Sequence, residues 1–184
     1  MKIQCFNRLD NKKGSLFKKN VIIGTLFFFI VSVMFVWKQN YSFNYIDSES
    51  MEPTIHKNTF IVCKKVNEET QLHRGDIITF RYPLDKSEVY VKRIIGLPGE
   101  KVSITNGIVT INEKKINEYY ITNKWTRGMG DYNYEIPEAS YLVLGDNRNN
   151  SEDSRYWNEK YMDLYGEYNE NISYVSRKDI LAVY

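Results

Sequence analysis

An uncharged apolar run near the N-terminus constrains this chain more than any other feature. Residues 21–37, VIIGTLFFFIVSVMFVW, contain seventeen residues without a charge. As a helix rising about 1.5 Å per residue, the run would extend roughly 25 Å, which approaches the hydrocarbon thickness of a bilayer. A buried core helix would carry a polar stripe, whereas only Gly24, Thr25 and Ser32 interrupt this run. We therefore expect a transmembrane helix here.

A cleaved secretory signal is the nearer alternative, because it also has basic residues before an apolar stretch. Its apolar region is usually about 7–15 residues long, however, and residues 38–43 offer no small-x-small cleavage site. We expect the segment to remain as an anchor.

The charges on the two sides of the anchor differ. Residues 1–20 carry six bases and one acid, and the remainder carries nineteen bases and 22 acids. Basic residues gather on the cytoplasmic side of membrane spans. We therefore expect a cytoplasmic basic tail over 1–20, a single anchor over 21–37 with Trp37 at the far interface, and an extracytoplasmic domain over 38–184. The net charge of +2 argues against a nucleic acid partner.

Cysteine and histidine usage predicts neither a disulfide nor a metal site. Under this topology Cys5 lies inside and Cys63 outside, so the two cannot pair within one chain. Cys63 fits a small buried residue of a strand better than a reactive thiol. His56 and His73 have no companion at a ligand spacing. We expect no metal and no cofactor.

The pattern after the anchor is mainly β. Runs rich in β-branched and aromatic residues predict strands over residues 59–63, 76–81, 88–95, 101–105, 108–111 and 141–144. Asn106-Gly107 predicts a type I′ hairpin turn, and Leu97-Pro98-Gly99 predicts a type II turn. The polar, tyrosine-rich segment over 157–173 has no strong period, which indicates a loop or a short surface helix.

Four short segments carry further information. SESMEPT over 48–54 has a serine shortly before a proline, which alone is weak evidence of a nucleophile. In YVKRIIG over 90–96, strand alternation puts Lys92 and Arg93 on opposite faces. If Lys92 lies among apolar side chains, burial lowers its pKa and lets it accept a proton from a serine. The alternative is a lysine on the solvent face.

The third segment, GDNRNNSEDSR over 145–155, follows a predicted strand. Two aspartates and two arginines within it indicate fixed ion pairs, and Ser151 or Ser154 could orient a neutral lysine. The fourth segment, HRGDIITF over 73–80, is explained as a turn that enters a strand and needs no function.

Together these segments resemble the conserved boxes of bacterial type I signal peptidases, which are membrane-anchored Ser-Lys endopeptidases of family S26. Lys92 is similar to the bacterial branch, because the endoplasmic-reticulum branch has histidine there. The short interval between Glu100 and Tyr141 resembles the compact Gram-positive form. The resemblance implies an anchor followed by a compact antiparallel β-sheet or coiled β-barrel catalytic domain.

The resemblance also implies roles for individual residues. Ser50 would be the nucleophile and Lys92 the general base, with Ser151 holding Lys92 in place. The Ser50 N–H and the Ser48 hydroxyl would form the oxyanion hole. Two structural ion pairs, Arg93 with Asp146 and Asp153 with Arg155, would lie behind the site. The walls of the pockets for small substrate residues would be Ile46, Met51, Ile55 and Tyr90.

The implied activity is cleavage of signal peptides from exported preproteins after Ala-x-Ala-type sites, by a monomer in the cell membrane. Two features depart from the family: the tyrosine-rich segment is inserted after Trp157, and Ala182 takes a glycine position. We therefore expect either a short last strand or a truncated chain, with a weakened closing edge of the sheet.

Two other functions share parts of this pattern. A self-cleaving Ser-Lys repressor would need a DNA-binding domain in place of the anchor. A pilus-dedicated assembly factor on the same fold would be expected to lack Ser50 or Lys92, and both are present.

Overall fold

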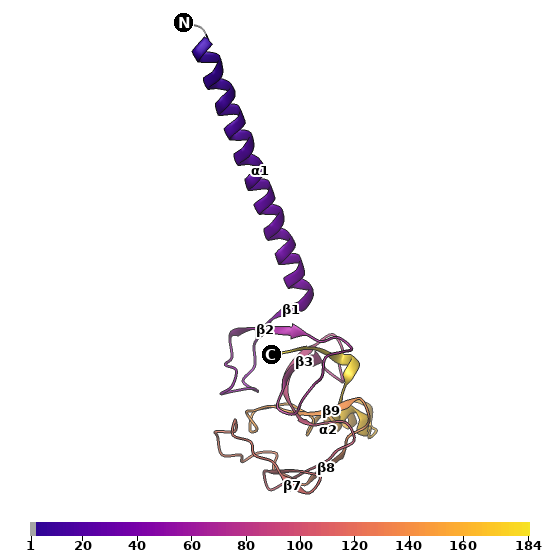
Figure 1. Ribbon diagram of the computed structural model, residues 1–184. Coiled ribbons are helices and arrows are strands. Elements are labelled where there is room, and N and C mark those ends of the chain that lie inside the picture. The colour runs from indigo at the N-terminus through magenta and orange to yellow at the C-terminus, as the bar shows by residue number, and fades with distance from the viewer. Residues whose placement is uncertain (1–2) are drawn as a thin grey trace. The chain divides into compact units, whose positions relative to one another are not determined.

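The computed structural model describes the backbone of residues 3–184 and the side chains of residues 17–184. The expectations that concern Cys5 and the bases Lys2, Arg8, Lys12 and Lys13 lie outside the described side chains. Helix α1 (Ile3–Asn40) contains the apolar run (Figure 1). An 18-residue stretch within residues 17–40 has a mean hydropathy of 2.3 and is not buried, so among the described residues this is the helix that could span a membrane.

The chain divides into two units, residues 1–40 and residues 41–184. The second unit is mainly antiparallel sheet, as predicted. Its seven-stranded sheet has the order β1-β2-β11-β3-β4-β9-β10, and its four-stranded sheet has the order β7-β6-β5-β8. The strands of the larger sheet are β1 (Tyr41–Ile46), β2 (Thr59–Lys65), β3 (Ile77–Arg81), β4 (Val89–Gly96), β9 (Ser140–Leu144), β10 (Val175–Ser176) and β11 (Ile180–Val183). Those of the smaller sheet are β5 (Lys101–Thr105), β6 (Ile108–Ile111), β7 (Lys114–Lys115) and β8 (Tyr132–Glu135).

All six predicted strands are present, with bounds that differ by at most two residues at either end. Both predicted turns are also confirmed. Asn106 and Gly107 have φ angles of 50° and 75°, as a type I′ turn requires between β5 and β6. Gly99 has a φ angle of 77°, and the Glu100 N–H donates to the Leu97 carbonyl at 3.2 Å.

The tyrosine-rich segment contains helix α2 (Trp157–Tyr165) and the 3-10 turn η1 (Glu170–Ser173), which agrees with a short surface helix. A second 3-10 turn, η2 (Arg177–Asp179), precedes β11. Trp157 opens α2 and is fully buried, whereas Leu164 and Tyr165 near its end are each 61% exposed. The helix is therefore anchored at its start and open to solvent at its end.

Strand β1 was missed because its pattern is inverted. The aromatic residues Phe43 and Tyr45 point outward and are 64% and 53% exposed, while Ser42 and Asn44 are partly buried. Alternation identifies a strand only when apolar side chains mark the buried face. In β1 the covered face carries polar side chains, so the periodicity gives the wrong signal.

The last strand, β11, is short, with four residues, as one of the two expectations had it. The expectation of a weakened closing edge near Ala182 is wrong. β11 lies inside the seven-stranded sheet, where it pairs with β2 on one side and β3 on the other. Ala182 is fully buried in a cluster with Ile61, Cys63 and Ile77. A strand hydrogen-bonded on both sides is not an edge, and a small side chain suits this packed position. Cys63 is a buried free cysteine, as predicted.

The core has three clusters, and β4 contributes buried hydrophobic residues to two of them. Ile95 joins a cluster between the sheets, which includes Val102, Ile104 and Leu144. Ile94 joins a second cluster on the other side of β4 with Phe80 and Trp157. Because both faces of β4 are covered, the charged residues next to Ile94 on this strand are held inside the protein.

Because Leu144 lies in the core between the sheets, the stability of the protein should depend strongly on it. Leu144→Ala should lower the free energy of unfolding by about 2–5 kcal/mol, because it leaves a cavity at a fully buried position. Leu164→Ala on the exposed side of α2 is the matched control and should change it by no more than about 0.5 kcal/mol. Denaturant unfolding of the full chain in detergent measures both; equal effects of the two variants would contradict this account of the core.

Candidate active site

Ser50 is fixed by the loop that connects β1 to β2. The Asn58 N–H donates to the Ile46 carbonyl at 2.7 Å, which closes the loop at its base, and the Ile55 N–H donates to the Met51 carbonyl at 2.9 Å. Met51 and Ile55 are buried in the core below. Ser50, directly before Met51, is only 6% exposed, and its Oγ lies 3.2 Å from the hydroxyl of Ser48.

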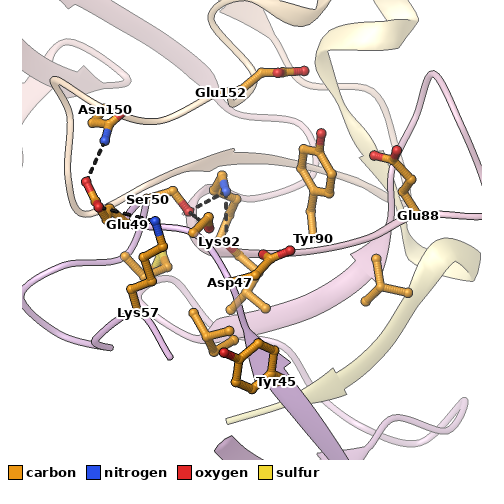
Figure 2. A pocket seen from close by; sticks show the side chains of 15 residues that line it. Tyr45, Asp47, Glu49, Ser50, Lys57, Glu88, Tyr90, Lys92, Asn150 and Glu152 are labelled. Atoms are coloured by element: carbon orange, nitrogen blue, oxygen red, sulfur yellow. Dashed lines mark hydrogen bonds and ion pairs between the residues drawn. The ribbon is translucent and has the colours of Figure 1, made fainter. Parts of the chain in front are cut away.

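Lys92 reaches Ser50 from the middle of β4. Its Nζ lies 2.8 Å from Ser50 Oγ and 3.1 Å from the Val91 carbonyl oxygen, and the side chain is 4% exposed. Figure 2 shows the two side chains meeting at the centre of the site. The alternative of a solvent-facing lysine is therefore wrong. Arg93 is also buried, so β4 carries a covered cation on each face.

Burial lowers the pKa of Lys92 to about 8. An ammonium group inside protein loses its hydration, which disfavours the charged form. The carboxylates of Asp153 and Glu152 act in the opposite direction and raise the pKa, while Arg155 lowers it. A lysine that is readily neutral and touches a serine hydroxyl can act as a general base toward that hydroxyl.

Asp153 organises the loop behind Lys92. It is fully buried and accepts hydrogen bonds from the Gly145 N–H at 3.0 Å and from Arg155 Nε and Nη2 at 2.8 Å each. Burial opposes its ionised form, but the Arg155 guanidinium and these hydrogen bonds hold the pKa of Asp153 below its usual range. The Ser151 hydroxyl also donates to Asp153, at 2.8 Å, rather than to Lys92.

A second ion pair connects Lys92's strand to the Ser50 loop. Arg93 Nε and Nη2 donate to the two carboxylate oxygens of Asp146 at 2.8 and 2.6 Å, which is a bidentate geometry. The same carboxylate accepts from the hydroxyl of Thr54, four residues after Ser50. Arg93 Nη1 also donates to the Gly75 carbonyl at 2.7 Å. The segment over 73–80, which the sequence explains as a turn without a function, therefore supports the site.

The loop over 145–155 also contacts the backbone of Ser50 directly. The Asn147 N–H donates to the Ser50 carbonyl at 3.0 Å. A Cβ on Gly145 would lie 2.5 Å from that carbonyl oxygen and 2.2 Å from Ser151 Oγ. Glycine is needed here because no side chain fits between this loop and the segment that carries Ser50.

Sequence reasoning missed Arg148 and Glu118. Arg148 is 3% exposed, and it forms an ion pair with Glu118 and donates to the Gly145 carbonyl at 3.1 Å. Its guanidinium lies over the ring of Trp125, 4.7 Å from the ring centroid. The arginine pattern of the segment suggested an ion pair, but no spacing rule indicates a partner thirty residues away.

A groove of about 880 Å³ exposes Ser50 and Lys92 at its floor. Ile46, Met51 and Tyr90 line it, whereas Ile55 is buried behind it and does not. In Figure 2, Glu49 lies beside Lys57 and Asn150. Among the residues whose side chains are described, no group of three acidic, histidine or cysteine side chains is arranged to hold a metal ion.

The chain is similar to known signal peptidases. A family model described as signal peptidase, peptidase S26, matches residues 19–183. Signal peptidase I of Bacillus amyloliquefaciens is 35% identical over 159 residues, which cover 80% of this chain and 84% of the relative. Signal peptidase I of Leptolyngbya laminosa is 42% identical over 125 residues, which cover 61% of this chain and 59% of the relative.

The matched part of this chain spans little more than half the length of some relatives, as for the Leptolyngbya protein and for a probable signal peptidase I-2 of Synechocystis, of which 54% is covered. A crystal structure of a signal peptidase I from Enterococcus faecalis is 28% identical, with a TM-score of 0.48, and the match covers 62% of this chain and 97% of that one.

The Arg93–Asp146 pair predicts a strong dependence of stability on Asp146. Asp146→Asn should lower the free energy of unfolding by about 3 kcal/mol or more, because the buried Arg93 charge loses its counter-ion. Glu135→Gln, in the exposed Lys101–Glu135 pair, is the control and should leave the unfolding midpoint unchanged. If Asp146→Asn is as stable as the control in the same denaturant titration, the pair does not hold the site together.

Proposed function

Because this chain belongs to the signal peptidase family, peptidase S26, we propose that it is a membrane-bound serine endopeptidase that removes N-terminal signal peptides from exported preproteins. The observation that carries the proposal is the 2.8 Å contact between Ser50 Oγ and the buried Lys92 Nζ at the floor of an open groove. A hydroxyl is a weak nucleophile at neutral pH, and a neutral amine at this distance removes its proton as it attacks.

The reaction proceeds in two stages. Lys92 takes the proton of Ser50 while Oγ attacks the carbonyl carbon of the scissile bond, and the protonated Lys92 then gives that proton to the leaving amine. The signal peptide remains bound to Ser50 as an ester. Lys92, neutral again, deprotonates a water molecule that hydrolyses the ester and regenerates the Ser50 hydroxyl.

The negative oxygen that forms during each stage needs hydrogen-bond donors. We assign this role to the Ser50 N–H and to the Ser48 hydroxyl, whose oxygen lies 3.2 Å from Ser50 Oγ. Donors fixed in advance toward a developing charge contribute several kcal/mol to catalysis, as a rough scale. Both groups belong to the loop that the segment over 145–155 holds in place.

Ser151 acts on Lys92 through Asp153. The Ser151 hydroxyl and Arg155 together fix the Asp153 carboxylate. The charge of this carboxylate raises the pKa of Lys92. Arg93 and Asp146 keep β4 and the Ser50 loop at a constant separation. These residues position the two reacting groups and do not touch the substrate.

The groove favours small apolar side chains before the cleaved bond. Ile46, Met51 and Tyr90 form its walls, with Ile55 filling the space behind Met51. A charged side chain against Ile46 or Met51 would lose hydration without gaining a hydrogen-bond partner from either residue, whereas a small apolar one would not. We therefore propose cleavage after Ala-x-Ala-type sites.

Helix α1 holds the enzyme at the membrane. We propose a cytoplasmic tail over 1–20, a single span over 21–37 and an extracytoplasmic catalytic domain over 38–184, acting as a monomer. Lys18 and Lys19 precede the apolar run and support this orientation. Confinement to the bilayer raises the effective concentration of signal peptides without a tighter site.

Removal of either reacting group should abolish cleavage. Ser50→Ala and Lys92→Ala should each lower kcat/KM by at least about 10⁴-fold, because each removes an indispensable part of one catalytic unit. The assay is cleavage of a preprotein with an Ala-x-Ala site by the full chain in detergent. The exposed substitutions Ser87→Ala and Lys114→Ala are controls and should retain full activity.

A wild type that binds the preprotein and never cuts it, with Ser50→Ala indistinguishable from it, would contradict the peptidase proposal. That result would favour the assembly-factor function.

The pKa of Lys92 sets the pH dependence of this activity. Lys92 must be neutral to accept the Ser50 proton, so kcat/KM should rise with pH, reach half its maximum near pH 8 and level off above. Initial rates at low substrate concentration between pH 6 and pH 10 measure the profile. A half-maximum close to the ordinary lysine pKa of about 10.4 would show that burial does not tune this lysine.

A further inference from the structure

Glu152 lies in the wall of the groove and differs in orientation from its neighbours. Ser151 and Asp153 are buried behind Lys92, whereas the Glu152 side chain is 39% exposed and lines the groove. Figure 2 shows it on the same side of the site as the ring of Tyr90. The resemblance to signal peptidases gives this residue no role, so its place in the groove needs its own explanation.

Two side chains hold the Glu152 carboxylate. The hydroxyl of Tyr82 donates to Glu152 Oε1 at 2.5 Å, and Lys160 Nζ of helix α2 lies 2.7 Å from the same oxygen. Tyr82 is 3% exposed and follows directly after β3. Lys160 Nζ also lies 5.4 Å from the centroid of the Tyr82 ring. The three side chains form one compact group, which we call the Glu152 cluster.

The Glu152 cluster is connected to Lys92 by stacked rings. The ring of Tyr82 stacks on that of Tyr90, with centroids 4.3 Å apart and planes 5° from parallel. Lys92 Nζ lies 5.3 Å from the centroid of the Tyr90 ring. The ring of Trp157, the first residue of α2, lies edge-on to the ring of Tyr82, with centroids 5.7 Å apart. A continuous set of packed side chains therefore connects helix α2 to Lys92.

Electrostatic interactions connect the same residues. Burial opposes ionisation of Glu152, but Lys160, Tyr82 and the charge of Lys92 hold its pKa below the usual range. The resulting carboxylate stabilises the protonated form of Lys92, together with Asp153 and against Arg155. The groups that face Glu152 are thus Tyr82, Tyr90, Lys160 and Lys92. Those that face Lys92 are Ser50, Tyr90 and the charges of Asp153, Glu152 and Arg155.

We propose that Glu152 is a positioning residue of the cleavage site, through which helix α2 sets the pH range in which the peptidase works. This inference rests on the function proposed above. Lys160 neutralises part of the Glu152 charge, and Tyr82 fixes the carboxylate in the groove wall beside Tyr90. The inserted segment that contains α2 therefore contributes to the function of the enzyme.

The test compares the pH profiles of kcat/KM for the full chain and four variants on one Ala-x-Ala preprotein. Glu152→Gln should move the half-maximum to lower pH, by roughly 0.5 unit, because protonated Lys92 loses a stabilising carboxylate. Lys160→Met should move it to higher pH, because Glu152 is then unneutralised. Lys160→Arg keeps the cation and should restore the wild-type profile. Glu159→Gln removes an exposed carboxylate from the same helix and should leave the profile unchanged.

A double variant separates this role from a merely structural one. If Lys160 acts through Glu152, Lys160→Met should cause little further shift when Glu152 is already Gln. Equal shifts in the two backgrounds, or a Glu152→Gln profile identical to that of the wild type, would overturn the proposal. Far-UV circular dichroism confirms that each variant is folded.

The two proposals fail differently. If the wild type does not cut, or Ser50→Ala cuts equally well, the function itself is wrong. If the wild type cuts with a half-maximum near pH 8 and the Glu152 variants do not move it, only the role of the Glu152 cluster is wrong.

Discussion

The contact between Ser50 and Lys92 is the interaction on which the other features of this site depend. A lysine amine is useful as a base only when it is neutral, and in water it is almost entirely protonated at neutral pH. The protein keeps Lys92 at 4% exposure, on a strand with core on both faces, so that desolvation favours the neutral form. Strand β4 is therefore a part of the core and, in the proposed mechanism, also the element that prepares the general base.

A buried lysine stays next to a serine only if the two backbone segments that carry these residues are held in place. The Arg93–Asp146 pair and the Thr54 hydroxyl connect β4 to the Ser50 loop, and Gly145 with Asn147 fixes the backbone of Ser50 from the other side. Buried ion pairs of this kind contribute little net stability, because desolvation offsets their attraction. Their value here is geometric, since they hold two groups from distant parts of the chain within hydrogen-bonding distance.

The sequence predicts the parts of this arrangement that follow from local pattern. Alternation and turn chemistry predict the strands of the core. The short motifs indicate Ser50 and Lys92 only through their joint resemblance to the signal peptidase family. The contact between residues 42 positions apart does not follow from any spacing, and neither does the partner of Arg148. The sequence does not predict strand β1, because its aromatic side chains face outward. It predicts a weakened closing edge where β11 lies inside the sheet, because the return of the chain into the sheet centre is a tertiary property. The resemblance implies that Ser151 holds Lys92 in place, whereas in the structure its hydroxyl donates to the Asp153 carboxylate.

The most direct test of this account is the protonation state of Lys92 itself. The full chain, labelled with ¹³C at lysine Cε and held in detergent, can be titrated by NMR, with the Lys92 signal identified by its absence from Lys92→Ala. The account predicts an inflection near pH 8 for this signal, while the exposed lysines titrate near the ordinary value of about 10.4. A Lys92 signal that titrates with the exposed lysines would contradict the claim that burial prepares it as a base.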